Sequence, residues 1–296
     1  MLCTLVDEPF DAKGWIFEIK WDGYRALAVK KGSVKLLSRN GLSFNKRYPS
    51  IVEELERLPG SFVLDGEIVI FDKEGRSHFQ LLQNYLRNHE GTPIYCVFDI
   101  LFLNGKDLRS KPLLERKKIL KAFLGKRKIL KFSDHVNEKG IAFFKAAAKK
   151  GLEGIIAKKA DSVYQSRRSR DWLKIKPGRG QEVVIGGFTP PKGSRKYFGA
   201  LVTGVYKGGK LIYSGLVGGG FNRQLLKDVH EKLKKLITPV CPFATRPKSK
   251  SSVTWVKPKL VCEVDFTEWT NEGLMRHPIF KGLRIDKAAK KVKREG

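Results

Sequence analysis

The sequence predicts an α+β protein, with a mixed α/β domain over residues 1–179 and a small β-barrel with a basic C-terminal tail over residues 180–296. Strand-like and helical patterns alternate up to Pro177, and short strand-like patterns dominate after it. The chain has 296 residues with 41% hydrophobic content, which is enough for two domains that each have a core.

The elements of the first domain follow from the spacing of apolar residues. The predicted strands are Trp15 to Trp21, Tyr24 to Val29, Phe62 to Phe71, Ile94 to Phe102 and Gly154 to Lys158. The predicted helices, in which apolar residues recur every three or four positions, are Tyr48 to Arg57, Leu113 to Leu124 and Lys139 to Lys150. This mixture indicates a sheet domain covered by helices.

The second domain has a different texture. Its predicted strands are Val183 to Phe188, Gly199 to Tyr206, Lys210 to Val217 and Leu260 to Trp269. Gly208-Gly209 predicts a hairpin, and Asn222 is placed to cap one helix. The apolar face of that helix would contain Leu225, Leu226, Val229, Leu233, Leu236 and Ile237. Strands interrupted by one helix fit a Greek-key barrel of the oligonucleotide-binding (OB) type.

The charge of the chain indicates its partner. The formal net charge is +29, from 59 Lys and Arg against 30 Asp and Glu, and the cations are spread along the whole chain. Such a field favours a polyanion, and nucleic acid is the commonest one. The alternative is the solvated surface of a thermophilic or halotolerant protein, but so large an excess of one sign destabilises a compact chain through self-repulsion.

Cysteine usage and hydropathy predict the compartment. The four cysteines lack the paired spacing of a zinc site or a disulfide framework, so reduced thiols are expected: Cys3, Cys96, Cys241 and Cys262. No run of about 18 apolar residues and no signal peptide is recognisable. We therefore expect a soluble cytoplasmic monomer without membrane contact, associated with the nucleoid if the cell is prokaryotic.

Lys20 is a candidate covalent nucleophile. Strand alternation places Glu18 and Lys20 on one face, and Asp22-Gly23 then turns the chain. A free lysine amine has a pKa near 10.4, so a nucleophilic lysine needs cations nearby that favour its neutral form. The candidates are Arg25, Arg39, Lys174, Lys176 and a bound divalent metal.

Three further patterns share this polar character. Asp65 and Glu67 fall on one strand face, Lys174 and Lys176 on another, and Glu153 precedes a buried strand whose Gly154 permits close backbone approach. Carboxylates on one strand and amines on another suit a metal-nucleotide site. Taken singly, each pattern is more often the polar face of an edge strand.

The ordered set of motifs resembles the ATP-dependent DNA ligases of the covalent nucleotidyltransferase superfamily, and most closely the ligase domain of the bacterial and archaeal end-joining ligases. The motifs are Lys20-Trp21-Asp22-Gly23, Ser38-Arg39-Asn40-Gly41, Asp65-Gly66-Glu67, Val97-Phe98-Asp99-Ile100, Glu153-Gly154-Ile155-Ile156-Ala157-Lys158, Trp172-Leu173-Lys174-Ile175-Lys176 and the segment from Arg276 to Lys287. The resemblance spans essentially the whole chain. It implies a nucleotidyltransferase (adenylation) domain followed by an OB-fold barrel.

The resemblance also implies a role for each residue. Lys20 would attack the α-phosphate of ATP and form lysyl-AMP. The residues implied to bind the nucleotide are Glu18 and Phe98 at adenine, Arg25 and Arg39 at phosphate or ribose, Glu67 and Glu153 at ribose or metal, Lys174 and Lys176 at the α-phosphate, and Arg284, Asp286 and Lys287 at pyrophosphate. Mg²⁺ or Mn²⁺ is the implied metal, with Glu67 and Glu153 as its ligands.

The implied partner is nicked or broken double-stranded DNA, sealed between a 5′-phosphate and a 3′-hydroxyl. Only 19 residues precede Lys20. We therefore expect either a minimal enzyme or one module of a longer polypeptide with polymerase or end-processing parts, helped by an end-bridging protein. The alternatives are an RNA ligase, an mRNA-capping-type guanylyltransferase, or a non-catalytic nucleic-acid-binding module.

Overall fold

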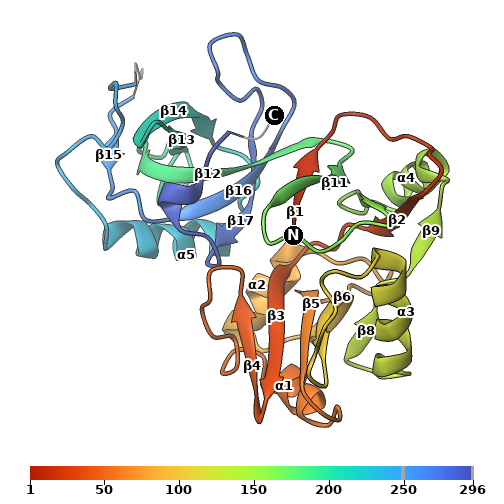
Figure 1. Cartoon of the computed structure of the whole chain (residues 1–296). Coiled ribbons are helices and arrows are strands. Elements are labelled where there is room, and N and C mark those ends of the chain that lie inside the picture. The colour runs from red at the N-terminus through yellow and green to blue at the C-terminus, as the bar shows by residue number, and fades with distance from the viewer. Residues whose placement is uncertain (248–250, 295–296) are drawn as a thin grey trace. The chain divides into compact units, whose positions relative to one another are not determined.

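The computed structural model of the chain describes residues 1–247 and 251–294 (Figure 1). The backbone forms two compact units, Met1–Pro177 and Gly178 onward. The predicted second domain ends with residues 295 and 296, which lie outside the described residues.

The first unit contains two β-sheets. Sheet I has the order β1-β11-β10-β2-β9. Its strands are β1 (Leu2–Leu5), β2 (Trp15–Ile19), β9 (His135–Asn137), β10 (Ile155–Lys159) and β11 (Arg168–Ile175). Sheet II has the order β4-β3-β5-β6-β7, and β8 pairs with β6. Its strands are β3 (Tyr24–Lys31), β4 (Ser33–Ser38), β5 (Phe62–Val69), β6 (Ile94–Leu103), β7 (Lys106–Asp107) and β8 (Leu130–Phe132).

Four helices accompany these sheets: α1 (Pro49–Glu56), α2 (Phe79–Asn88), α3 (Leu113–Leu124) and α4 (Gly140–Lys149). α4 packs on sheet I through a cluster that contains Ala147, Phe17 and Ile155. Side chains of both sheets meet where Phe98 of β6 lies edge-on to Trp172 of β11, with ring centroids 6.0 Å apart. This contact marks the region in which the polar motifs gather.

The structure confirms the three helices and five strands predicted in the first unit to within about two residues at each end. Helix α2 was not predicted. Its buried residues Phe79, Leu82 and Tyr85 do follow a helical spacing, but its cap comes from a distant residue. The Phe79 N–H donates to the carboxylate of Asp22 over 3.0 Å, so the usual start signal is absent from the adjacent sequence.

The second unit is a five-stranded barrel. Its main strands are β12 (Arg179–Phe188), β13 (Leu201–Lys207), β14 (Lys210–Val217), β16 (Val261–Phe266) and β17 (Ile279–Arg284). They are ordered β14-β13-β12-β16-β17, and the short β15 (Thr254–Trp255) also pairs with β12. A parallel bridge between Gly219 and Ile279 joins the outer strands, with the Phe280 N–H donating to the Gly219 carbonyl oxygen over 3.0 Å. This closure and strand order confirm the predicted OB-type barrel.

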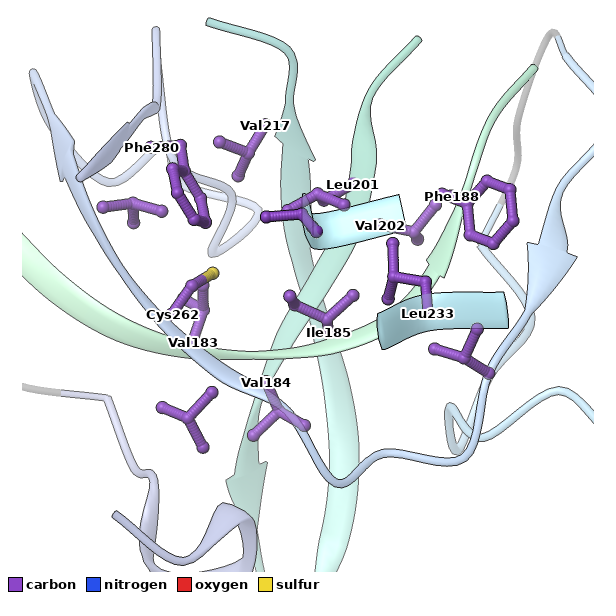
Figure 2. Close-up of a cluster of buried hydrophobic side chains, with 14 of the residues drawn as sticks. Val183, Val184, Ile185, Phe188, Leu201, Val202, Val217, Leu233, Cys262 and Phe280 are labelled. Atoms are coloured by element: carbon purple, nitrogen blue, oxygen red, sulfur yellow. The ribbon is translucent and has the colours of Figure 1, made fainter. Parts of the chain in front are cut away.

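Helix α5 (Arg223–Lys234) lies between β14 and β16 in the chain. Asn222 caps it as predicted, since its side chain accepts from the Leu225 N–H over 2.8 Å. Figure 2 shows Leu233 of α5 among barrel residues such as Ile185 and Val202. The prediction was wrong for Ile237, which lies beyond the helix end and is 51% exposed.

The hairpin and the tail complete this unit. Lys207 pairs with Lys210, and both Gly208 and Gly209 have positive φ, as the predicted hairpin turn requires. The tail is fastened to the barrel over its described part. The Tyr206 N–H donates to the carbonyl oxygen of Val292, a residue with no exposed surface. The backbone of the tail is therefore anchored to the barrel at Val292.

Candidate functional site

Lys20 lies directly after β2, and its backbone N–H donates to the Gly154 carbonyl oxygen over 3.0 Å. Its ammonium forms an ion pair with Oε1 of Glu153. The same oxygen lies 2.9 Å from Nζ of Lys176. We call Lys20, Glu153 and Lys176 the Lys20 cluster. The side chain of Lys20 is 19% exposed, so its amine lies among the predicted neighbours and remains reachable.

The strand ends place these three side chains together. β10 pairs with β2 on one side and with β11 on the other, which sets Ile156 opposite both Glu18 and Lys174. Gly154 has a φ of +136°, and a Cβ there would overlap the Ile175 carbonyl oxygen. The close approach that this glycine permits is therefore to the neighbouring strand, rather than to a ligand as the sequence suggested.

The Asp-Gly pair after Lys20 has a structural role that the sequence did not reveal. The Asp22 N–H donates to the Ser77 hydroxyl over 3.1 Å, and the Asp22 carboxylate accepts from the Phe79 N–H. A Cβ on Gly23 would overlap the Ile68 carbonyl oxygen. The turn is thereby fixed against sheet II and the start of α2.

Glu18 is buried and already paired. Its Oε1 lies 2.8 Å from Nζ of Lys117 and 2.9 Å from Nζ of Lys158, and Ser133 donates to its other oxygen over 3.1 Å. Burial raises the pKa of Glu18, but the two ammonium groups outweigh this effect and hold that pKa below its usual range. Burial lowers the pKa of Lys117 despite the attraction of Glu18. Sequence reasoning assigned no role to Lys117 or Lys158.

Phe98 is surrounded by cations. Nζ of Lys158 lies 4.6 Å from the centroid of its ring, and the guanidinium carbon of Arg25 lies 5.4 Å away. Lys158 also lies 4.2 Å from the Trp172 ring centroid. The predicted base-stacking ring is thus part of an aromatic and cationic wall between the two sheets.

Arg25 is held by a buried carboxylate. Its Nε and Nη2 donate to the two oxygens of Asp65 over 2.9 and 2.6 Å, and Tyr164 donates to the same carboxylate over 2.8 Å. Burial raises the pKa of Asp65, yet the charge and hydrogen bonds of Arg25 lower it overall. This fork fixes the guanidinium beside Phe98. Asp65 was not a predicted site residue, although it stands in the quoted motif.

The other predicted residues of this unit are more spread out. Glu67 is half-buried on β5 opposite Arg25 of β3. Lys174 is half-buried on β11 opposite Ile156. Arg39 is exposed in the turn after β4. The structure therefore joins Lys20, Glu153 and Lys176 directly.

The carboxylates fit a metal that is bound mainly through its substrate. Among residues 1–247 and 251–294, no three His, Cys, Asp or Glu side chains gather into a ready-made cage. Mg²⁺ usually binds one or two carboxylates together with water and phosphate oxygens. Glu67 and Glu153 supply that kind of ligand.

A second charged group lies in the barrel. Arg284 donates from Nε and Nη2 to the two oxygens of Asp286 over 2.9 and 2.8 Å, and from Nη1 to Glu263 over 3.1 Å. Lys287 pairs with Glu182. We call these five residues the Arg284 cluster. The sequence predicted its two cations and Asp286, but it missed Glu182 and Glu263.

Comparison with protein families identifies both units. The family model described as "ATP dependent DNA ligase domain" matches residues 1–176, and "ATP dependent DNA ligase C terminal region" matches residues 194–287. In the described part of the chain, no helix is long and apolar enough to cross a membrane.

Several known proteins are similar over nearly the whole chain. The multifunctional non-homologous end joining protein LigD of Pseudomonas aeruginosa is 42% identical and covers 98% of this chain, which spans 36% of that protein. The SPbeta prophage-derived DNA ligase-like protein LigB of Bacillus subtilis is 32% identical, with 96% of this chain and 98% of that protein covered. A solved structure of mycobacterial DNA ligase D with ATP and MES is 35% identical, with a TM-score of 0.70 and coverage of 99% and 98%.

Proposed function

The chain belongs to the ATP-dependent DNA ligases, and from this premise we propose that Lys20 carries AMP during the sealing of DNA strand breaks. The observation that supports this role most directly is the Lys20 cluster. One reachable amine shares the Glu153 carboxylate with Lys176, so two amines lie together at the place where a phosphate would react.

The first step transfers AMP to the protein. The neutral amine of Lys20 attacks the α-phosphorus of ATP, the N–P bond forms, and the bond to the pyrophosphate oxygen breaks. Lys174 and Lys176 lie on one strand face and neutralise the charge that builds on the α-phosphate. Such catalysis depends on positioning and on fixed charges more than on proton transfer.

The remaining residues of the first unit hold the nucleotide. Phe98 and Glu18 bind the adenine, and the Asp65-held guanidinium of Arg25 and the exposed Arg39 bind phosphate or ribose oxygens. For Glu18 to contact the adenine base, Lys117 and Lys158 must still neutralise part of the charge of its carboxylate. This set is our assignment of the nucleotide site.

Glu67 and Glu153 would hold Mg²⁺ or Mn²⁺, which supplies charge neutralisation at the phosphates when it is bound. Arg284, Asp286 and Lys287 would orient the pyrophosphate in this first step only. In the second step an oxygen of the 5′-phosphate of the break attacks the phosphorus of AMP, a P–O–P bond forms, and the N–P bond breaks to return the amine of Lys20. In the third step the 3′-hydroxyl attacks that phosphate and AMP leaves.

The names of the relatives support a proposal for the working substrate. The chain spans about a third of the length of the LigD proteins it matches, which are named as multifunctional end-joining proteins. We propose that it seals nicks or broken ends of double-stranded DNA in end joining, at the nucleoid. It would act beside fused polymerase or end-processing modules or an end-bridging protein.

The experiment is incubation with radiolabelled ATP or GTP and Mg²⁺ or Mn²⁺, followed by denaturing gel electrophoresis. We expect labelled AMP on the wild-type protein and none on Lys20→Ala, which should still seal a nick that is already adenylated. ATP-driven sealing by Lys20→Ala would overturn the proposal. A GMP adduct would favour capping chemistry instead.

A further inference from the structure

A cavity in the barrel unit has no assigned role. It lies between the loop after β12 and the first turn of α5, and its volume is about 360 Å³. It is lined by Ser194, Arg195, Lys196, Tyr197, Arg223 and Leu226. The volume is near the lower end of the range of small-ligand sites, about 300 to 1,000 Å³, so it suits a fragment of a chain molecule.

The cations around this cavity are not neutralised. Within the described part of the chain, no ion pair joins Arg195, Lys196 or Arg223 to a carboxylate. No acidic residue lines the cavity. The Arg284 cluster of the same unit differs, because each of its cations has a carboxylate partner. The cavity therefore presents positive charge to which an anion can bind.

The loop that forms one wall is built rather than loose. Thr189 closes its base, since the Thr189 N–H donates to the Ala200 carbonyl oxygen and the Gly199 N–H donates to the Thr189 carbonyl oxygen, each over 2.9 Å. Phe198, fully buried, anchors the loop in the barrel core, and its ring centroid lies 5.2 Å from that of Phe221. A closed, anchored loop holds its cations in place before a ligand arrives.

Arg195 has a hydrogen-bond donor without a partner in the described part of the chain, and Tyr197 has an uncommon backbone conformation. Nε of Arg195 donates to the Phe198 carbonyl oxygen over 2.9 Å, whereas its buried Nη2 has no hydrogen-bond partner among the described residues. Tyr197 has a φ of +74°, a backbone conformation that is costly for a residue with a Cβ. The tyrosine ring packs 5.7 Å from the His230 ring of α5. These contacts hold the loop in one defined conformation beside α5.

We propose that this cavity is a phosphate-binding subsite for one strand of the nucleic-acid substrate. Arg195, Lys196 and Arg223 bind one backbone phosphate, and the partial positive charge at the start of α5 adds to their attraction. Tyr197 contacts the adjoining sugar or base. The inference rests on the proposed DNA-sealing function and deepens it by naming where the barrel holds a strand.

The test compares two glutamine variants on one helix. Arg223→Gln alters the cavity. Lys232→Gln removes the same charge nine residues later, about 13 Å along the axis and on the opposite side of α5. Lys196→Gln is the second cavity variant, and its side chain is exposed, so folding should not depend on it. Binding to a nicked duplex is measured without ATP over a range of salt concentrations.

We expect Arg223→Gln and Lys196→Gln each to bind nicked DNA about tenfold more weakly. The slope of log affinity against log salt should fall by about 0.9 for a lost phosphate contact. Lys232→Gln should change neither quantity beyond the loss of a distant charge. AMP transfer from ATP to the protein should be the same in all variants, because that step needs no DNA.

A duplex series sharpens the result. One neutral methylphosphonate is moved along each strand, and we expect one position where it weakens wild-type binding but has no further effect in Arg223→Gln. Absence of such a position, or equal losses in Arg223→Gln and Lys232→Gln, would overturn the subsite. A wild-type protein that takes no AMP from ATP would instead overturn the proposed function.

Discussion

The Lys20 cluster and the Arg284 cluster balance charge in opposite ways. In the first, two amines share one carboxylate, and Lys20 and Glu153 are both partly exposed. In the second, Arg284 and Lys287 face three carboxylates, and Asp286 is almost fully buried. In the second group, each cation is thus held by a carboxylate of its own unit.

This difference teaches that a residue's presence in a motif does not show that its charge is available. Arg284 matches the position at which the family resemblance implies a pyrophosphate contact, yet its guanidinium is satisfied on three nitrogens within the barrel. Burial lowers the pKa of Arg284, but its acidic neighbours outweigh this and raise that pKa well above its usual value. It therefore stays charged, and only its partner can change.

The largest predicted effect tests whether a carboxylate that two amines share contributes more to stability when it is buried than when it is partly exposed. Glu18 and Glu153 each pair with two amines, but Glu18 is 2% exposed. We expect Glu18→Gln to lower the free energy of unfolding by about 3 to 5 kcal/mol, because it leaves buried ammonium groups unpaired. The control Glu153→Gln should cost about 1 kcal/mol or less. Urea unfolding of both variants measures this, and equal losses would contradict the distinction.

Comparison of Glu18→Gln with the wild type also tests how the stability of the protein depends on pH. The pKa of Glu18 is lowered from its ordinary value of 4.5, so its contribution to stability is present above that pH and is lost as the pH falls below it. The stability of Glu18→Gln should therefore fall less steeply than that of the wild type between about pH 5 and 3.

The next effect concerns the second amine of the Lys20 cluster. Lys176→Ala removes one of the two amines that pair with Glu153, and AMP transfer to the protein should slow by roughly 100-fold. Lys159→Ala is the control, because Lys159 lies on the adjacent strand β10 and pairs with Asp171 over 3.2 Å, outside the cluster. Single-turnover transfer of labelled AMP measures both. A comparable loss in the control would show that general strand packing, not the cluster, sets the rate.

The smallest effect is expected in the barrel. Arg284→Ala should slow AMP transfer by roughly tenfold, because part of its attraction to phosphate is already opposed by carboxylates. Sealing of a pre-adenylated nick should be unchanged. Arg284→Lys keeps a charge near Asp286 and separates lost chemistry from lost folding, which thermal unfolding also reports. Slowing of both steps to the same degree would remove the assignment of Arg284 to the first step.

The sequence predicted elements whose signals are local. The Asn222 cap and the Gly208-Gly209 hairpin are both present, because each depends on residues within a few positions of one another. Helix α2 was missed because its cap, Asp22, is 57 positions away from Phe79. Local patterns cannot reveal a helix cap that a distant turn provides.

In the candidate site, too, local patterns predicted some contacts and missed others. Strand patterns grouped Lys20 with Glu153 and Lys176, which meet at the ends of neighbouring strands of sheet I. The partner of Glu18 was not predictable, because Lys117 lies 99 positions later on α3 and its approach depends on the sheet-to-helix packing. Glu263 escaped for a similar reason, because the register of β16 against β17 places it two residues from the position opposite Arg284.

The hydrogen bond from the Phe79 N–H to Asp22 links the turn after Lys20 to the start of α2. Asp22 is only two residues from Lys20. An adduct on the Lys20 amine that shifts this turn would therefore also shift the first amide of α2. Deuterium uptake at that amide, followed while ATP is added, would register occupancy of the lysine without any label on the nucleotide.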